Sequence, residues 1–109
     1  LNLIYIDTGA MYRAVTLKAL RNNIKPKEPE KLKEMLEKIS IKLKRKDNKQ
    51  QVLLDGEDVS DEIRTTKVDS WVAKYSAVKQ VREKMTPLQR EMKSQGNIIM
   101  EGRDVLQPL

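Results

Sequence analysis

The chain has 109 residues, with 22 Lys and Arg against 16 Asp and Glu, so its formal net charge is +6. It contains no cysteine and no histidine, which excludes disulfides, thiolate chemistry, the commonest neutral-pH base and a typical zinc site. It also has no apolar run long enough to span a membrane and nothing that resembles a signal peptide, so we expect a cytoplasmic protein with no membrane partner.

The first predicted element is a buried strand that runs into a helix. Leu3–Ile6 is apolar throughout, as strands covered on both faces are. The residues Asp7-Thr8-Gly9 combine two helix-capping types with a glycine that permits a sharp turn. A helix should then cover Gly9–Arg21 and end at the two asparagines that follow.

The next segment is predicted to hold a helix and a small antiparallel sheet. Pro29 should start the helix, because proline is tolerated at the first helical position. Two strands, Ile41–Lys44 and Gln51–Leu54, should pair as a hairpin. A short third strand over Glu57–Ser60 should follow the turn at Asp55-Gly56.

Lysines are frequent between Lys25 and Lys49, where a nucleic-acid site would be sought. They are interleaved with acidic residues, and the stretch holds no aromatic residue on which a base could stack. A solvated charged surface is therefore the favoured interpretation, and nucleic acid is not expected as a partner.

Two further helices are predicted in the second half of the chain. Ser60 or Asp61 should cap a short turn before the first of them, which covers about Thr65–Val78. The second should cover Lys79–Lys93. Because a proline inside a helix costs about 3 kcal/mol, a break or kink is expected near Thr86, next to the internal proline.

The last predicted element, Asn97–Met100, repeats the logic of the first: an apolar strand is followed by Gly102-Arg103-Asp104. It should lie parallel to Leu3–Ile6, joined to it by one right-handed crossover. Ligands of open parallel sheets bind beyond the carboxyl ends of the strands, so Arg13 and Arg103 could converge there on an anion. The alternative, slightly favoured by spacing alone, is a capped amphipathic helix with a solvated Arg13.

Four short motifs follow one another along the chain. They are Asp7-Thr8-Gly9-Ala10-Met11-Tyr12-Arg13, Gly56-Glu57-Asp58-Val59 with Glu62-Ile63-Arg64, Val81-Arg82-Glu83 with Gln89-Arg90, and Glu101-Gly102-Arg103-Asp104. No single motif is decisive. In this order and spacing, however, they resemble bacterial cytidylate kinases over residues 1 to about 105.

The resemblance implies an α/β fold and a phosphoryl-transfer activity. The chain would be a fragment of a P-loop nucleoside monophosphate kinase, with two parallel core strands joined by a helical insert that carries a small antiparallel sheet. The core would comprise 1–24 and 96–109, and the insert that binds CMP would comprise 25–95. The family transfers the γ-phosphoryl group of ATP to CMP or dCMP in pyrimidine nucleotide metabolism, with Mg²⁺.

The resemblance assigns substrate contacts to Thr8, Tyr12, Arg13, Arg82, Arg103 and Asp104. Arg13 and Arg103 match the arginines that hold the CMP phosphate, whereas Arg82 and Asp104 match residues near the cytosine. A carboxylate there can accept from the exocyclic amine and so discriminate against uracil. The other two match positions that line the same pocket. Arg64 matches a recurrent arginine of unassigned role, for which a structural ion pair is an equal alternative. No catalytic residue and no metal ligand is assigned.

Two departures from the family pattern bear on what the chain can do. Ala73 stands where the family commonly has a base-contacting serine, a loss for which Ser70 or Ser76 could compensate. The residues from Leu1 onward contain no glycine-rich loop ending in Gly-Lys-Ser/Thr, which the family places just upstream of the strand that matches Leu3–Ile6. We therefore expect the CMP-binding part of a kinase, which binds no ATP or Mg²⁺ and is inactive alone. Without a neighbouring strand, 97–100 would expose an edge through which copies could associate.

A non-catalytic basic domain that binds nucleic acid or an acidic protein is the alternative function. Such a domain would spread its arginines along a helix or a sheet face. Arg13 and Arg103 instead both follow buried strands, which favours the kinase.

Overall fold

The computed structural model describes residues 4–7, 9–46, 49–94 and 98–101, and it describes side chains over 9–44 and 49–90. The elements in chain order are β1 (Ile4–Asp7), α1 (Gly9–Arg21), α2 (Pro29–Lys38), β2 (Ile41–Lys46), β3 (Lys49–Leu54), β4 (Glu57–Asp58), the 3₁₀ helix η1 (Glu62–Arg64), α3 (Thr66–Ser76), α4 (Lys79–Ser94) and β5 (Ile98–Glu101). β1 and β5 form a parallel pair, and β2, β3 and β4 form an antiparallel sheet in that order. The predicted α/β class, with its two small sheets, is confirmed.

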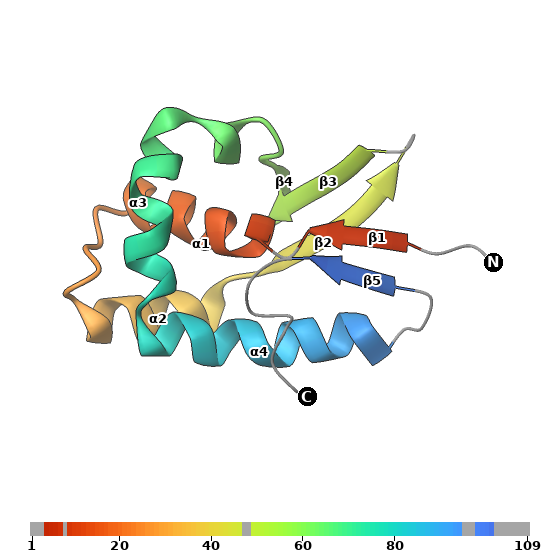
Figure 1. Ribbon diagram of the computed structural model, residues 1–109. Coiled ribbons are helices and arrows are strands. Elements are labelled where there is room, and N and C mark those ends of the chain that lie inside the picture. The colour runs from red at the N-terminus through yellow and green to blue at the C-terminus, as the bar shows by residue number, and fades with distance from the viewer. Residues whose placement is uncertain (1–3, 8, 47–48, 95–97, 102–109) are drawn as a thin grey trace.

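Helix α1 is the buried centre of the fold. It packs against α2, α3, α4, η1 and the strands β2 and β3, and Figure 1 shows it running through the middle of the molecule. Its buried residues are Ala10, Met11, Tyr12, Ala14, Val15, Thr16, Leu17 and Ala19. The alanines among them have small side chains, so the surrounding elements can approach closely.

The end of α1 lies where the two asparagines predicted it. Asn23 has a φ of 55°, in the left-handed region that asparagine tolerates. The Ile24 N–H donates to the Ala19 carbonyl at 2.9 Å, and the Asn23 N–H donates to the Leu20 carbonyl at 3.2 Å. These two bonds satisfy carbonyls that the helix would otherwise leave unpaired.

Helix α2 and the three-stranded sheet add the second part of the core. The apolar stripe of α2 is buried, as its helical spacing predicted, through Leu32, Met35, Leu36 and, just past its end, Ile39. In the sheet, Ile41 pairs with Leu54 and Leu43 pairs with Val52, and these side chains face the core. Lys42 and Lys44 alternate with them and are exposed, which is the predicted pattern of a half-buried strand.

The predicted bounds of all three strands of this sheet were wrong. β2 ends at Lys46 rather than Lys44. β3 begins at Lys49 rather than Gln51, because Lys49 pairs with Lys46 and the hairpin is therefore tighter than expected. β4 ends at Asp58 rather than Ser60. The Ser60 hydroxyl accepts from the Val52 N–H at 3.0 Å, so a side chain takes a donor that a longer strand would pair with a backbone carbonyl.

Between β3 and α3 the sequence predicted a turn, which the structure has, and a side-chain cap, which it does not have. Asp55 and Gly56 have φ values of 50° and 85°, and both central residues of a type I′ hairpin turn need a positive φ. The predicted turn is confirmed. The predicted cap is not, because Asp61 occupies the N-cap position of η1 without a side-chain hydrogen bond. The Ser60 hydroxyl is used by Val52 and Asp58 instead.

Helices α3 and α4 follow the predicted order, and α4 differs in one respect. Thr65 caps α3 by accepting from the Val68 N–H at 3.4 Å. α4 runs without interruption through Pro87, so the helix does not break near Thr86, and the alternative of a kink there stays a prediction. Pro87 is exposed, while Met85 beside it is fully buried. Packing of the neighbouring side chains therefore holds the helix together in spite of the missing N–H.

The strands β1 and β5 are parallel neighbours, as predicted, with Ile4 opposite Ile98 and Asp7 opposite Glu101. The buried residues of α1, α2, α3, α4 and the three-stranded sheet form one hydrophobic cluster. That cluster crosses the boundary expected at residue 24. The division into 1–24, 25–95 and 96–109, and self-association through a strand edge, stay predictions.

Candidate functional site

The carboxyl ends of β1 and β5 lie side by side. β1 ends at Asp7 and β5 ends at Glu101, and these two residues are register partners. Thr8, Arg103 and Asp104, which were predicted to contact substrate, follow these strand ends and lie outside the described residues. The described backbone thus brings together the two chain positions from which the predicted site would be built.

Arg13 lies in the second turn of α1, between that helix, η1 and α3. Its Nη1 donates to the Ile63 carbonyl at 3.1 Å and forms an ion pair with the Asp69 carboxylate. The side chain is 34% exposed. It is therefore only partly solvated, whereas the alternative prediction was a fully solvated Arg13. Among the residues that the structure describes, the contacts of Arg13 use only Nη1. The N–H groups on Nε and Nη2 are further donors that could bind a phosphate.

Two more cations of α1 are tied to the same part of the chain. Lys18 pairs with Asp55, and Arg21 pairs with Glu57 and Glu62. Each of the three cations on α1 therefore meets a carboxylate from the segment 55–69. These pairs were not predicted, because a pairing between residues so far apart in the chain leaves no local sequence pattern.

The Arg21 contacts have good geometry. Its Nη1 and Nη2 each donate to a different carboxylate oxygen of Glu57 at 3.1 Å, and Nη2 also donates to Glu62 at 2.6 Å. The hydrogen bonds to Glu57, and then those to Glu62, raise the pKa of Arg21 above its ordinary value. This guanidinium is committed to protein carboxylates, which makes it a poor candidate for substrate binding.

Asp55 is held by α1 and by the start of β2. Partial burial acts to raise the pKa of its carboxyl, but the Lys18 ammonium and the Ser40 N–H, which donates at 2.8 Å, outweigh burial and lower it. Asp55 is therefore charged at neutral pH, and it joins α1 to the beginning and the end of the hairpin.

The other described residues of the predicted site lie on α1 and α4, two helices that pack against each other. Tyr12 is 6% exposed and belongs to the core. Arg82 is half-buried in the first turn of α4. Ala73 is exposed on α3, and the nearby Ser70 hydroxyl donates to the Thr66 carbonyl of its own helix at 2.9 Å.

Arg64 is exposed at the end of η1. A structural ion pair was one of the two alternatives for this residue. Arg64 makes no ion pair with any residue that the structure describes.

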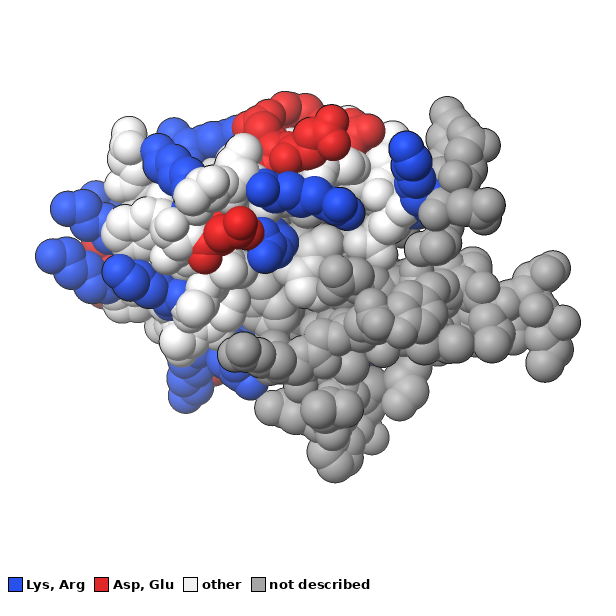
Figure 2. Space-filling model, turned by 45° about the horizontal axis from the view of Figure 1, so that its top comes forward, with Lys and Arg blue, Asp and Glu red and all other residues white. Residues whose placement is uncertain are grey.

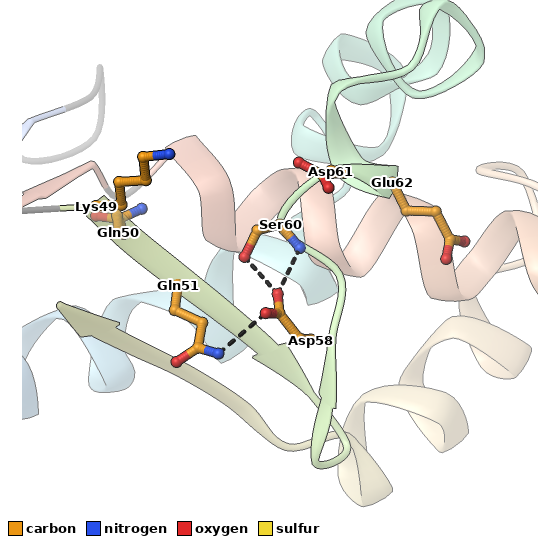
Figure 3. Close-up of a pocket in the computed structure, with 7 residues that line it drawn as sticks. All are labelled: Lys49, Gln50, Gln51, Asp58, Ser60, Asp61 and Glu62. Atoms are coloured by element: carbon orange, nitrogen blue, oxygen red, sulfur yellow. Dashed lines mark hydrogen bonds between the residues drawn. The ribbon is translucent and has the colours of Figure 1, made fainter. Parts of the chain in front are cut away.

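A hollow of about 630 Å³ beside β3, β4 and η1 is the wrong kind of site for a phosphate. It is lined by Lys49, Gln50, Gln51, Asp58, Ser60, Asp61 and Glu62; Figure 3 shows these side chains along β3, β4 and the segment that leads into η1. Acidic side chains gather at the top of the molecule in Figure 2, with basic side chains around them. With one cation against three carboxylates, the lining would repel an anion.

The carboxylate of Asp58 should have a pKa of about 2, below its ordinary value of 3.8. The Ser60 hydroxyl donates to it at 2.5 Å, the Gln51 amide at 3.0 Å and the Ser60 N–H at 3.0 Å, and all three favour the ionised form. A lowered pKa in the folded state means that Asp58 stabilises the fold above pH 3.8, and that this contribution is lost as the pH falls toward 2.

A carboxyl ¹³C titration by nuclear magnetic resonance would measure the pKa of Asp58. Ser60→Ala should raise it, because that change removes the hydroxyl donor and keeps the backbone N–H. A pKa near 3.8 in the unsubstituted protein would contradict the hydrogen bonds drawn in Figure 3.

The described residues contain neither a membrane-spanning helix nor a metal-binding cluster. None of the helices in the part of the chain that the structure describes is long and apolar enough to cross a membrane. Within the same residues, no group of three or more His, Cys, Asp or Glu side chains could hold a metal ion.

The fold is that of an α/β protein, and Arg13, on the helix that follows β1, marks a candidate anion site. Comparison with known proteins gives the family. The family model for cytidylate kinase matches residues 1–107. Cytidylate kinases of Caldicellulosiruptor bescii and Caldicellulosiruptor saccharolyticus are 46% and 47% identical to this chain over 105 residues, and that of Carboxydothermus hydrogenoformans is 45% identical. These matches cover 96% of this chain and 46–47% of the relatives.

The chain belongs to the cytidylate kinase family. It spans somewhat less than half the length of the curated relatives that it matches. The resemblance carried by the four sequence motifs is confirmed, and the alternative of a non-catalytic basic domain is not favoured.

Proposed function

We propose that the natural protein containing these residues is a cytidylate kinase, which transfers the γ-phosphoryl group of ATP to CMP or dCMP. The described residues would contribute to the CMP-binding part. The observation that carries this proposal, beside the family match, is Arg13. It is a half-buried arginine whose Nε and Nη2 make no hydrogen bond or ion pair with a described residue, and it lies on the helix that follows β1, where two parallel strands end together.

Phosphoryl transfer between two nucleotides needs positioning and charge neutralisation more than covalent help from the protein. The phosphates of CMP and ATP repel each other, so a cation must hold the acceptor phosphate in place. Arg13 would supply a planar set of donors for this purpose, together with Arg103. Arg82 and Asp104 would contact the cytosine, and Thr8 would line the same pocket.

Tyr12, the remaining member of the proposed site, is buried in the core. Its carbonyl accepts from the Thr16 hydroxyl at 2.8 Å within α1. Tyr12 would therefore line the site from within the core and steady the turn of α1 that carries Arg13.

ATP and Mg²⁺ are part of the proposed reaction, but we assign neither to the described residues. Those residues contain no carboxylate cluster that could hold a metal ion. When bound, Mg²⁺ would neutralise charge on the transferring phosphates. The part played by this chain is to bind and orient the acceptor nucleotide.

The proposal is tested by supplying the natural protein with ATP, Mg²⁺ and one acceptor at a time, and by measuring ADP release. CMP and dCMP should be phosphorylated, and UMP should react more slowly, because a carboxylate at Asp104 would face a carbonyl in place of an amine. Release of ADP that does not depend on any of these acceptors would overturn the proposed activity. Equal rates with CMP and UMP would remove the base-reading role of Asp104.

A further inference from the structure

Asp69 is the carboxylate that pairs with the proposed phosphate-binding arginine. It lies in the first turn of α3, and its carboxylate contacts the same Nη1 of Arg13 that donates to the Ile63 carbonyl. Asp69 therefore neutralises part of the positive charge of Arg13 that would otherwise attract a substrate phosphate.

The contact is one that an anion in solution could replace. The side chains of Asp69 and Arg13 are 51% and 34% exposed, so the ion pair lies at the protein surface. Asp69 also has a second source of stabilisation, because a carboxylate in the first turn of a helix interacts favourably with the helix dipole. The Ile63 carbonyl remains as an acceptor for Nη1 when the carboxylate leaves.

We propose that Asp69 is the counter-ion of Arg13 in the ligand-free protein, and that the 5′-phosphate of the substrate displaces it. This inference rests on the proposed function, in which Arg13 binds that phosphate. A doubly charged phosphate attracts the guanidinium more strongly than one carboxylate does, whereas a singly charged anion gains little by the exchange. Asp69 thereby acts as a specificity-determining residue, because only a doubly charged anion displaces it readily from Arg13.

The test compares two ligands that differ only in the phosphate. CMP and cytidine are titrated by calorimetry into the natural protein and into Asp69→Asn, which keeps the size of the side chain and removes its charge. Exposed ion pairs are worth little, so the variant should bind CMP roughly two- to five-fold more tightly. Cytidine, which has no phosphate to compete with Asp69, should bind as before.

Asp61→Asn is the matched control. Asp61 is also exposed, lies between β4 and α3, and makes no ion pair with a described residue. The Asp61→Asn substitution removes the same charge as Asp69→Asn at a residue that does not contact Arg13. The gain in CMP affinity should therefore be larger for Asp69→Asn than for Asp61→Asn. Asp69→Ala should give the same gain as Asp69→Asn, and serves if the asparagine variant folds poorly.

Three results would overturn the inference, and one of them separates it from the proposed function. CMP affinity that is unchanged or weaker in both Asp69 variants shows that Asp69 does not compete with the phosphate. A gain of equal size in Asp61→Asn shows a general charge effect. If the unsubstituted protein binds CMP no more tightly than cytidine, Arg13 holds no phosphate, and the proposed function fails along with the inference.

Discussion

Replacing Arg13 by alanine in the natural protein should weaken CMP binding by ten-fold to a hundred-fold. A hydrogen bond to a charged group contributes about 1.5–3 kcal/mol, and each 1.4 kcal/mol is ten-fold in affinity. Calorimetric titration measures the effect directly. Binding of cytidine should change little, because the base contacts are assigned to other residues.

The matched control for this substitution is Arg21→Ala. It removes the same charge from the same helix, and Arg21 is engaged by Glu57 and Glu62. CMP affinity should stay within about two-fold in this variant, as expected for an exposed charge that does not touch the ligand. An equal loss in both variants would mean that only net charge matters, and an unaltered affinity in Arg13→Ala would remove Arg13 from the site.

Replacing Tyr75 by alanine should destabilise the fold by about 3–5 kcal/mol, the usual cost of deleting a buried aromatic side chain. Tyr75 is 2% exposed on α3, and its hydroxyl donates to the Ile24 carbonyl in the loop after α1. It thus joins α3 to the end of the central helix. Urea unfolding followed by circular dichroism measures the change.

Tyr75→Phe separates packing from the hydrogen bond. It keeps the ring and leaves the Ile24 carbonyl without this donor, so it should cost about 1–3 kcal/mol, less than the alanine variant. If phenylalanine is as costly as alanine, the hydrogen bond and not the ring holds α3 in place. A loss below about 1 kcal/mol for alanine would contradict the core position of Tyr75.

The elements of this fold were predictable where each one carries its own local signal. The apolar stripe of α2 after Pro29, the two asparagines at the end of α1 and the Asp55-Gly56 turn all lie where the sequence placed them. α4 does not break at Pro87, because the packing of this helix outweighs the local cost of a proline. Packing between distant segments is not encoded in a local pattern.

The surroundings of Arg13 were predictable only in part. The family resemblance assigned Arg13 to the CMP phosphate, whereas spacing alone slightly favoured a solvated side chain. The structure confirms that β1 and β5 end together. Asp69, which pairs with Arg13, lies 56 residues away in the chain, and only the packing of α1 against α3 brings the two together. The sequence could therefore name Arg13 as a candidate anion-binding residue, but it could not name the carboxylate that pairs with it.

The most direct test of the central claim, that Arg13 holds the phosphate of the acceptor nucleotide, is a crystal structure of the natural protein with CMP bound. We expect phosphate oxygens at hydrogen-bonding distance from the Arg13 guanidinium, about 2.7–2.9 Å, with the Asp69 carboxylate no longer paired to it. A CMP phosphate bound elsewhere, with the Arg13–Asp69 ion pair intact, would contradict the account.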